Sequence, residues 1–309
     1  MLIKSADDKT KRLTLLQDLQ NSQLLDDAQK KRLGEDIFKL RRGIQGEKAA
    51  AHYLDNYFGD GKNSAIIHDL RLNLDGEIAQ IDHLVINRIL DFFLLETKSF
   101  GGDITITPHG EFSVKYAGDR TYNIPSPIEQ SKRHENVLRR LLNKLEIKGR
   151  AGIGLRFKHV VLVDPKAAIK RPDAKLFDSS MVIGADQFRT WQLAHLDKEV
   201  GAVDVITTLF NVRGSDAVKE VAEKIVRQHK PENLLTLPDW LLPKLAPPKT
   251  AGPQRLSVAE VKTPKSPGRK TLTCMTCGMK ITYEEGKFCW NNEKRFNGGQ
   301  YCRPHQNSF

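Results

Sequence analysis

The sequence predicts an α/β protein followed by a small cysteine-containing module. An amphipathic helical segment precedes three consecutive apolar strand segments, and a second helical segment and another apolar strand follow them. Apolar residues recur at a helical spacing in the two helical segments and form short runs or alternate in the strand segments. All four cysteines lie within the last 36 residues, which sets this end of the chain apart.

Length and hydropathy restrict the class of protein. A chain of 309 residues has room for about two domains. No apolar run approaches the roughly 18–20 residues of a membrane span. The opening segment MLIKSADDKTKR lacks the apolar centre of a signal peptide. We therefore expect a cytoplasmic protein that makes no membrane contact.

The net charge of +11 is concentrated near the end of the chain. Residues 244–309 contain twelve Lys and Arg against four Glu and no Asp. Such a segment attracts polyanions through the release of counterions. A solvated tail without a partner explains the same charge equally well, so charge alone does not decide between the two.

Four segments are expected along the chain. Residues 1–42 form an N-terminal helical arm, in which apolar residues recur every three or four positions, and such helices could associate between copies. Residues 43–235 form the main domain. Residues 236–270 form a linker rich in proline and lysine. Residues 271–309 form the cysteine-containing module.

The main domain is expected to begin with a helix over residues 43–59, which ends at a Gly-Asp-Gly sequence. Ser126 and Pro127 begin a later helix, as a capping residue and a first-turn proline. A last helix includes residues 217–228. The expected strands cover residues 64–70, 78–86 and 91–100, a hairpin over 102–114, and then 157–163 and 205–210.

Three charged residues lie in two consecutive apolar strands. Asp82 is near the start of one strand, while Glu96 and Lys98 end the next and share a face because alternate strand residues do. If the strands pair around residues 87–90, Asp82 falls opposite residues near 95–96. The turn chemistry there is weak, and a slip of one residue would turn Asp82 away.

Two neighbouring carboxylates repel each other unless a cation lies between them. Carboxylate and carbonyl oxygens suit Mg²⁺ or Mn²⁺, so Asp82, Glu96 and the backbone carbonyl of Thr97 are candidate ligands. Lys98 is then placed to hold or help deprotonate an attacking water, and metal and lysine together would stabilise charge on a phosphate. The simpler alternative is a surface ion pair on an edge strand.

Four motifs occur in order along the main domain: GIQGE at 43–47, QIDHLVI at 80–86, LLETKSFGG at 94–102 and SPIEQ at 126–130. They resemble the Gly-x-x-Gly-Glu motif, the Gln-Ile-Asp-His segment, the Glu-x-Lys followed by Gly and the Asn-Pro-x-x-Gln motif of the nuclease-related domain (NERD) family. This family is a branch of the PD-(D/E)xK restriction-endonuclease-like superfamily. The resemblance covers roughly residues 41–148. Ser126 stands where the family commonly has Asn, and both residues can cap a helix.

The resemblance implies a restriction-endonuclease-like core, α-β-β-β-α-β, with a central mixed sheet flanked by helices. It also implies a metal-dependent nuclease that hydrolyses phosphodiester bonds in DNA. Asp82 and Glu96 would bind the metal, and Lys98 would position the water. Glu47 would complete the acidic cluster or hold a metal-bound water, and Gln130 would face the same pocket. Without the resemblance, Glu47 would only be a favourable charge near a helix start.

The cysteine-containing module carries two short-spaced pairs of metal ligands. Cys274-x2-Cys277 followed by glycine is a zinc-knuckle pattern, because the glycine permits the turn that aims both sulfurs inward. Cys302-x2-His305 supplies a second pair after 24 intervening residues. We expect these four residues to bind zinc, with a four-cysteine site that includes Cys289 as the alternative. A closed site of this kind serves folding rather than catalysis, and the module resembles small treble-clef-like zinc modules.

Basic residues of the module alternate with aromatic ones. Such a surface could bind the DNA backbone and stack on bases. Most of these aromatic side chains are nevertheless expected to form the module's core, and Trp290 is the first candidate for an exposed one.

The sequence therefore supports two functions. The first is a metal-dependent deoxyribonuclease whose zinc module assists DNA binding; RNA as the substrate is not separated from DNA. The alternative is a non-catalytic protein that binds nucleic acid or a partner on a nuclease-like scaffold. All five candidate catalytic residues are present, which favours the enzyme. His83, next to Asp82, points to the opposite face and is expected to pack rather than to act in catalysis.

Overall fold

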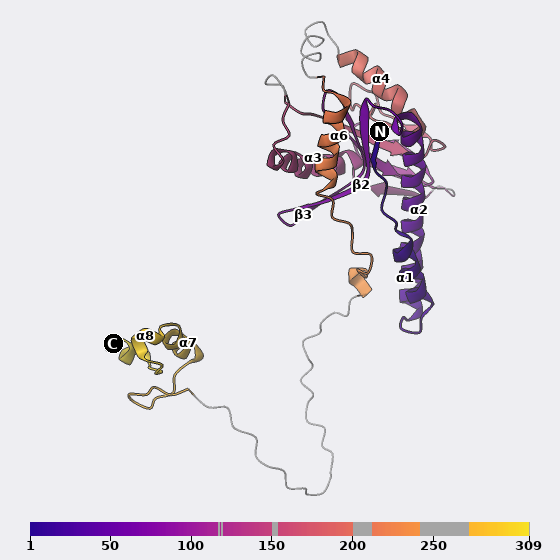
Figure 1. Ribbon diagram of the computed structural model, residues 1–309. Helices are drawn as coiled ribbons and strands as arrows, with labels where there is room; N and C mark the ends of the chain where they lie inside the picture. Colours follow the sequence, from indigo (N-terminus) through magenta and orange to yellow (C-terminus); the bar gives the residue numbers. More distant parts are fainter. Residues whose placement is uncertain (117, 119, 150–153, 200–211, 242–271, 309) are drawn as a thin grey trace. The chain divides into compact units, whose positions relative to one another are not determined.

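The computed structural model describes the chain except for residues 117, 119, 150–153, 200–211, 242–271 and 309 (Figure 1). The chain divides into two compact units, Met1–Lys244 and Leu245–Phe309. The strand expected over residues 205–210 and nearly all of the expected linker lie outside the described residues. The limits proposed for the four segments stay predictions.

The main sheet of the first unit has the strand order β1-β2-β3-β4-β8-β10. β2, β3 and β4 are antiparallel neighbours, whereas β1, β8 and β10 join the sheet in parallel. With α2 before and α3 after the antiparallel strands, the predicted order α-β-β-β-α-β in a mixed sheet is confirmed. The bounds of the strands are β1 (Leu2–Lys4), β2 (Ser64–Leu74), β3 (Glu77–Asn87), β4 (Asp91–Lys98), β8 (Arg156–Val163) and β10 (Val182–Gly184).

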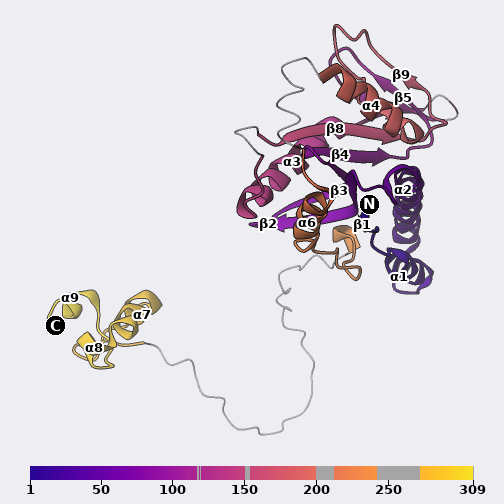
Figure 2. The same ribbon diagram turned by 45° about the horizontal axis from the view of Figure 1, so that its top comes forward.

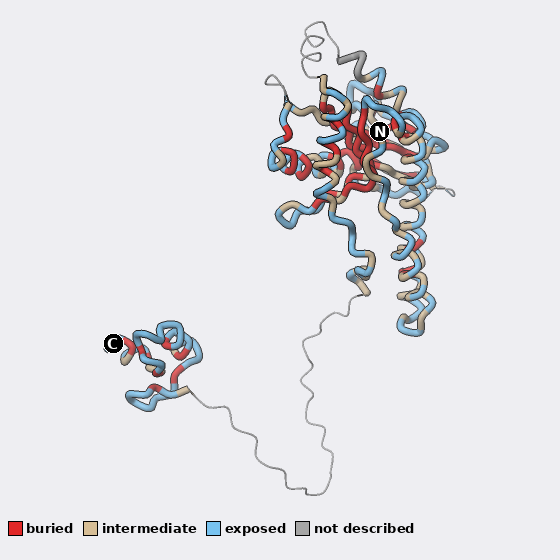
Figure 3. Tube along the Cα trace, in the orientation of Figure 1, coloured by how far each residue is buried: buried red, intermediate tan, exposed pale blue. Residues whose placement is uncertain are grey.

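Helices cover both faces of this sheet (Figure 2). α2 and α4 pack on one face, over a core that includes Leu54 and Phe93. α3 and α6 pack on the other face, over a core that includes Leu84 and Leu138. The central strands are therefore buried on both sides, as Figure 3 shows. The bounds of the helices are α2 (Asp27–Phe58), α3 (Pro127–Lys144), α4 (Phe188–Glu199) and α6 (Ser215–Val226), and the 3₁₀ turn η1 (Ala185–Gln187) precedes α4.

α2 is a single helix of 32 residues, although the sequence predicts a new helix at residue 43. Asp26 begins it with a capping box, since its side chain accepts from the backbone of Gln29 and the Gln29 side chain binds back. Gly43 and Gly46 lie inside the helix, where each glycine costs about 1 kcal/mol relative to alanine. Packing on the sheet offsets this cost, so the helix does not break there.

α1 (Thr10–Asn21) packs against the first half of α2. Leu16, Leu33 and Ile37 are buried between the two helices. Trp240, in the 3₁₀ turn η2 (Asp239–Leu241), packs on this cluster, and its Nε1 donates to Asp36 Oδ2 over 3.1 Å. The apolar faces of the predicted arm thus pack within one chain, and association between copies stays a prediction.

A smaller sheet has the strand order β7-β6-β5-β9. Its β5–β6 hairpin is the one predicted over residues 102–114, and Gly110 in the turn has a φ of 77°. β7 and β9 are not expected from the sequence, because four and two residues are too few for a recognisable pattern. The strands are β5 (Asp103–Ile106), β6 (Phe112–Lys115), β7 (Thr121–Ile124) and β9 (Ile169–Lys170).

The second unit is described over residues 272–308. An isolated bridge between Thr273 and Lys280 closes the first cysteine turn. Thr282 and Glu285 form a capping box at the start of the first helix. The helices are α7 (Tyr283–Asn291), α8 (Glu293–Phe296) and α9 (Arg303–Gln306). None of the helices in the described parts of either unit combines the length and hydropathy required to cross a bilayer.

Candidate active site and metal centre

The side chain of Asn87 fixes the turn between β3 and β4. Its Oδ1 accepts from the backbone N–H of Ile89 (3.1 Å) and of Asp91 (2.9 Å), and its Nδ2 donates to Asp91 Oδ2 (3.0 Å). Leu90 has a left-handed φ of 58°, and Arg156 of β8 pairs with the buried Asp91 carboxylate. A turn held by so many polar contacts sets the register of the two strands.

This register brings Asp82 beside Glu96. His83 lies opposite Leu95 in the β3–β4 ladder. The next pair of positions along the two strands is therefore Asp82 and Glu96. The Oδ2 of Asp82 accepts a hydrogen bond from the backbone N–H of Thr97 over 2.7 Å. The structure therefore brings together the two acids that the sequence pattern places on one face.

A shift in side-chain alternation keeps Asp82 out of the apolar core. Leu84 belongs to the core under α3 and α6, and so does Ile81, which strict alternation would place on the other face. β2 shows the same shift at Asp69, whose φ is 51°. Asp69 and Asp82 form the step missing from the β2–β3 ladder. Both carboxylates thus lie at a break in the sheet rather than within an apolar face.

Lys98 is held between a strand and a helix. Its Nζ donates to Glu96 Oε1 over 2.7 Å and to Gln130 Oε1 over 3.1 Å. Gln130 is in the first turn of α3, which starts as predicted, with Ser126 as its cap and a proline in the first turn. One turn further, His134 Nδ1 lies 3.7 Å from Glu96 Oε2. The side-chain amide oxygen of Gln130 therefore accepts a hydrogen bond from Lys98.

Glu47 reaches the site from α2 and is paired with a lysine of the N-terminal segment. Lys9 Nζ donates to Glu47 Oε2 over 2.9 Å and lies 3.3 Å from Asp69 Oδ2. Gln80 Nε2 donates to the other oxygen of Asp69 over 2.9 Å. Asp69 at the sheet break and Glu47 on α2 are thus connected through one cation, which comes from outside the four motifs.

Two glycines let other segments approach the site closely. A Cβ at Gly46 would lie 2.4 Å from the Cβ of Ser99, so a glycine there lets α2 pack on the end of β4. Gly101 has a φ of 66°, and a Cβ there would lie 1.2 Å from Nη2 of Arg42. These contacts give physical reasons for the second glycine of GIQGE and for the first glycine after the Glu-x-Lys motif.

Burial and mutual repulsion shift the pKa values of the ionisable side chains in the site. The pKa of Asp82 is raised well above its usual value by burial and by the charges of Glu96 and Glu47. Burial also raises the pKa of Glu96, although Lys98 opposes the shift. The pKa of His134 is lowered to about 4 by burial and by nearby cationic side chains, so its ring is neutral at pH 7. Acids that resist ionisation in this way are stabilised as carboxylates by a bound cation.

One cavity of about 780 Å³ unites the predicted site. Its lining includes every candidate residue of the proposed catalytic and divalent-metal site: Glu47, Asp82, Glu96, Thr97, Lys98 and Gln130. The Oγ1 of Thr97 is buried and has no hydrogen-bond partner among the described residues, while its N–H serves Asp82. A role for its carbonyl as a metal ligand stays a prediction.

His83 lies on the other face, as the alternation predicts. Its Nδ1 is 2.8 Å from Nδ1 of His68, whose Nε2 is 3.1 Å from Asp55 Oδ1. Burial lowers the pKa of both rings, which are therefore neutral at pH 7. A proton on Nε2 of His68 would donate to Asp55 and leave its Nδ1 to accept from His83. With these protons, His83 donates a hydrogen bond to His68 and packs inside the fold.

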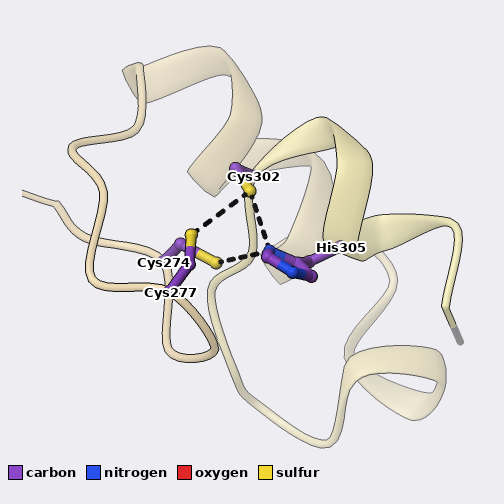
Figure 4. A group of neighbouring side chains, drawn as sticks. All are labelled: Cys274, Cys277, Cys302 and His305. Atoms are coloured by element: carbon purple, nitrogen blue, oxygen red, sulfur yellow. Dashed lines mark hydrogen bonds between the residues drawn. The ribbon is translucent and has the colours of Figure 1, made fainter.

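The second unit brings Cys274, Cys277, Cys302 and His305 together (Figure 4). Their ligand atoms all lie within 4.8 Å of one another, with Sγ of Cys277 and Cys302 3.8 Å apart. Two sulfurs bound to one tetrahedral zinc ion lie about 3.8 Å apart, so this spacing fits the ion. The group could hold zinc, and it is the set preferred from the sequence.

Local structure places each pair of ligands. The N–H of Gly278 donates to the carbonyl of Cys274 over 2.8 Å, and its φ of 69° closes the turn that carries Cys274 and Cys277. Cys302 and His305 lie at the start of α9. Burial raises the pKa of the Cys274 thiol, but hydrogen bonds from neighbouring backbone N–H groups outweigh it and bring the value to about 5. This favours the thiolate, which is the form that binds metal.

Cys289, the alternative ligand, lies outside this group. It is buried on α7, where its Sγ accepts from the backbone N–H of Tyr301 and from Nε2 of Gln306, each over 3.4 Å. Its thiol therefore supports the fold of the unit.

The prediction that most aromatic residues of this unit are buried is wrong. Phe296 is buried and Trp290 is exposed (41%), as expected, but Tyr283 (66%) and Phe288 are exposed as well. A unit this small cannot cover every face of α7, so its aromatic side chains do not all fit into the core.

Comparison with known protein families gives a match to part of the chain. Residues 42–163 match the family model described as a nuclease-related domain. The matched part of the chain runs from the second half of α2 through β8, and the matching family is the one that the four motifs resemble. The match extends beyond the four motifs to include β8. No curated protein and no solved structure matched the chain.

Two residues of the site were not found from the sequence. Lys9 precedes the family match by many residues, and nothing in its surroundings indicates that it meets Glu47. His134 is four residues after Gln130, so the helical spacing of α3 could have indicated that both face Glu96.

Proposed function

We propose that this chain is a divalent-metal-dependent nuclease that hydrolyses phosphodiester bonds in DNA. The observation that supports this proposal most strongly is the common cavity lined by Glu47, Asp82, Glu96, Lys98 and Gln130. These residues come from α2, β3, β4 and α3, so their convergence depends on the whole core. The match to a nuclease-related domain supports a nuclease-related function on independent grounds.

The donor set suits Mg²⁺ or Mn²⁺. Asp82 and Glu96 offer carboxylate oxygens, and burial raises the pKa of both, so a nearby cation would favour their ionised forms. Hard oxygen ligands with room for water are what these ions prefer. When bound, such an ion would supply charge neutralisation at a phosphate and a more acidic water.

The chain's own side chains would orient the reactants. Lys98 Nζ, held by Glu96 and Gln130, would donate to the attacking water or to a phosphate oxygen. The N–H of Thr97 holds the Asp82 carboxylate in place. Glu47, fixed by Lys9, would hold a further water at the edge of the acidic cluster.

The zinc unit is proposed to assist DNA binding rather than catalysis. Its four ligands leave no position for a substrate, and its exposed aromatic residues lie in a basic part of the chain. The unpaired thiols fit a reducing compartment, so we place the protein in the cytoplasm. RNA remains a second substrate to be tested beside DNA.

One observation favours the alternative, a non-catalytic nucleic-acid-binding or partner-binding protein. Lys98 and Lys9 already pair with Glu96 and Glu47, so two of the acids have cations at hand without a metal. In a scaffold that had lost catalysis, such ion pairs would be structural.

A cleavage assay with Lys98→Ala tests the proposal. Purified chain with Mg²⁺ or Mn²⁺ is incubated with linear, circular and single-stranded DNA, and products are followed over time. The variant should cut about 10²- to 10⁴-fold more slowly, because it lacks the group that orients the water. Lys224→Ala is a matched control, since Lys224 also pairs with a glutamate, but on the surface of α6.

Cleavage at the same rate in wild type and Lys98→Ala would contradict the proposed active site. No cleavage by the wild type, together with DNA binding, would favour the non-catalytic alternative.

A further inference from the structure

We infer that the proposed nuclease site takes single-stranded nucleic acid, or a strand with an unpaired nucleotide beside the scissile phosphate. This inference rests on the proposed function and names the form of its substrate. It comes from a part of the cavity that the four motifs do not explain. We call this part the aromatic wall, formed by Phe38, Phe100, Tyr116 and Tyr122.

The aromatic wall exposes large rings where a core would hide them. Phe38 is 63% exposed and Tyr122 56% exposed, yet both line the cavity. Neither ring belongs to a hydrophobic cluster of the described residues. Tyr116 meets Tyr122 edge to face, with 5.9 Å between ring centroids, which holds the two rings together. Exposed apolar area of this kind marks a binding surface.

The two exposed rings that line the cavity come from different elements. Phe38 belongs to α2, whereas Tyr122 belongs to β7 of the smaller sheet. Bases could therefore stack on rings that two different elements supply. Stacking on aromatic rings is the usual way in which proteins hold bases without reading their sequence.

Basic residues connect the aromatic wall to the acids. Phe38, Lys39, Arg42 and Glu47 all line the same cavity and follow one another in this order along α2. The guanidinium of Arg42 lies over Gly101, directly after the strand that carries Lys98. The order along the helix is therefore aromatic, basic, then acidic. It matches a strand whose bases stack at one end and whose phosphate reaches the carboxylates at the other.

Paired DNA does not fit this arrangement. In a duplex each base is stacked between its neighbours, so its face is not available to a side chain unless it is unpaired or flipped out. The cavity of about 780 Å³ also has the size of a small-ligand site, roughly 300–1,000 Å³. It has room for one or a few nucleotides, and a base that stacks on its rings must be unpaired.

Binding measurements on the full chain test this inference. Lys98→Ala with Ca²⁺ serves as the starting protein, so that cleavage does not consume the probe. A labelled 12-nucleotide single strand and the blunt duplex of the same sequence are compared by fluorescence anisotropy. Adding Phe38→Ala or Tyr122→Ala should weaken single-strand binding about 5- to 150-fold for each ring and leave duplex binding nearly unchanged.

Two further variants separate stacking from damage to the fold. Tyr57→Ala is the matched control, because Tyr57 is also an exposed aromatic residue of α2 (53%) but does not line the cavity. Tyr122→Phe keeps the ring and should retain single-strand affinity. A 2-aminopurine base in the strand should lose fluorescence on binding, and Phe38→Ala with Tyr122→Ala should abolish this quenching.

The outcomes distinguish this inference from the proposed function. Equal losses for single strand and duplex, or no loss for either, would overturn the inference whether or not the wild type cleaves DNA. Ring-dependent binding of the single strand by a wild type that never cleaves would uphold the inference as a binding mode and reject the nuclease.

Discussion

The candidate zinc centre and the carboxylate–lysine site differ in how far apart their residues lie in the sequence. The candidate zinc ligands fall within Cys274–His305, and two local turns present all four. The other site gathers residues from Lys9 to His134, on two helices, two strands and the N-terminal segment. Spacing alone is therefore enough to identify the first site. The second requires a correct strand register, a helix packed at close range and a cation from far away.

The largest effect is expected from removing one zinc ligand. Cys274→Ser should abolish zinc binding and unfold the second unit, since structural zinc supplies about 10–16 kcal/mol in small zinc-binding domains. The first unit has its own core and should keep its melting temperature. Metal analysis and limited proteolysis would show loss of about one zinc per chain and cleavage after residue 244.

Cys289→Ser is the matched control for that experiment. Its thiol is buried outside the ligand group, so zinc content should be unchanged while the unit becomes slightly less stable. Loss of zinc from Cys289→Ser with retention in a His305→Ala variant would reverse the ligand assignment.

The order of the core elements and the clustering of Cys274, Cys277, Cys302 and His305 could be predicted because each depends on local signals. Helix caps such as Ser126, apolar strand runs and short Cys spacing act over a few residues. The resemblance to a family then added Glu47 and Gln130, which no local signal singles out. The comparison with family models supports that resemblance over residues 42–163.

The remaining features depend on contacts that sequence spacing does not reveal. The turn at residues 87–90 has no glycine, and the Asn87 side chain that holds it acts through backbone groups. The shift at Asp69 and Asp82 involves two strands at once, so neither strand shows it alone. Lys9 meets Glu47 across 38 positions of sequence. Such contacts follow only from the packed fold.

A second prediction tests whether the carboxylate–lysine site depends on distant packing. Gly46→Ala places a Cβ against Ser99, 2.4 Å from its Cβ, so α2 must move away from the end of β4. We expect a loss of about 2–3 kcal/mol in the free energy of unfolding, measured in urea, and weaker binding of Mn²⁺.

Gly43→Ala is the matched control, three residues earlier in the same helix. No atom lies within 4 Å of its added Cβ, so the change should stabilise α2 by about 0.5–1 kcal/mol. Equal effects of the two substitutions would show that helix propensity, rather than the approach of α2 to β4, governs both positions.

The smallest expected effect concerns the charge of Asp82. Its folded-state pKa is raised, so its ionised form destabilises the metal-free fold. The stability that the protonated group contributes is fully present below the unfolded pKa and is lost as pH rises through the folded pKa. Asp82→Asn removes the charge and can still accept the hydrogen bond from Thr97.

The metal-free Asp82→Asn variant should therefore be more stable than wild type by about 1–2 kcal/mol at pH 8. This difference should shrink as pH falls, because the wild-type carboxyl then takes up its proton. Added Mn²⁺ should stabilise wild type and not the variant, since only wild type offers both carboxylates. Urea unfolding at several pH values measures all three effects, with the exposed Asp75→Asn as the control. A variant that is less stable than wild type at pH 8 without metal would mean that Asp82 is an internal structural anion. Asp82 would then not carry the destabilising charge by which this site differs from the cysteine and histidine cluster.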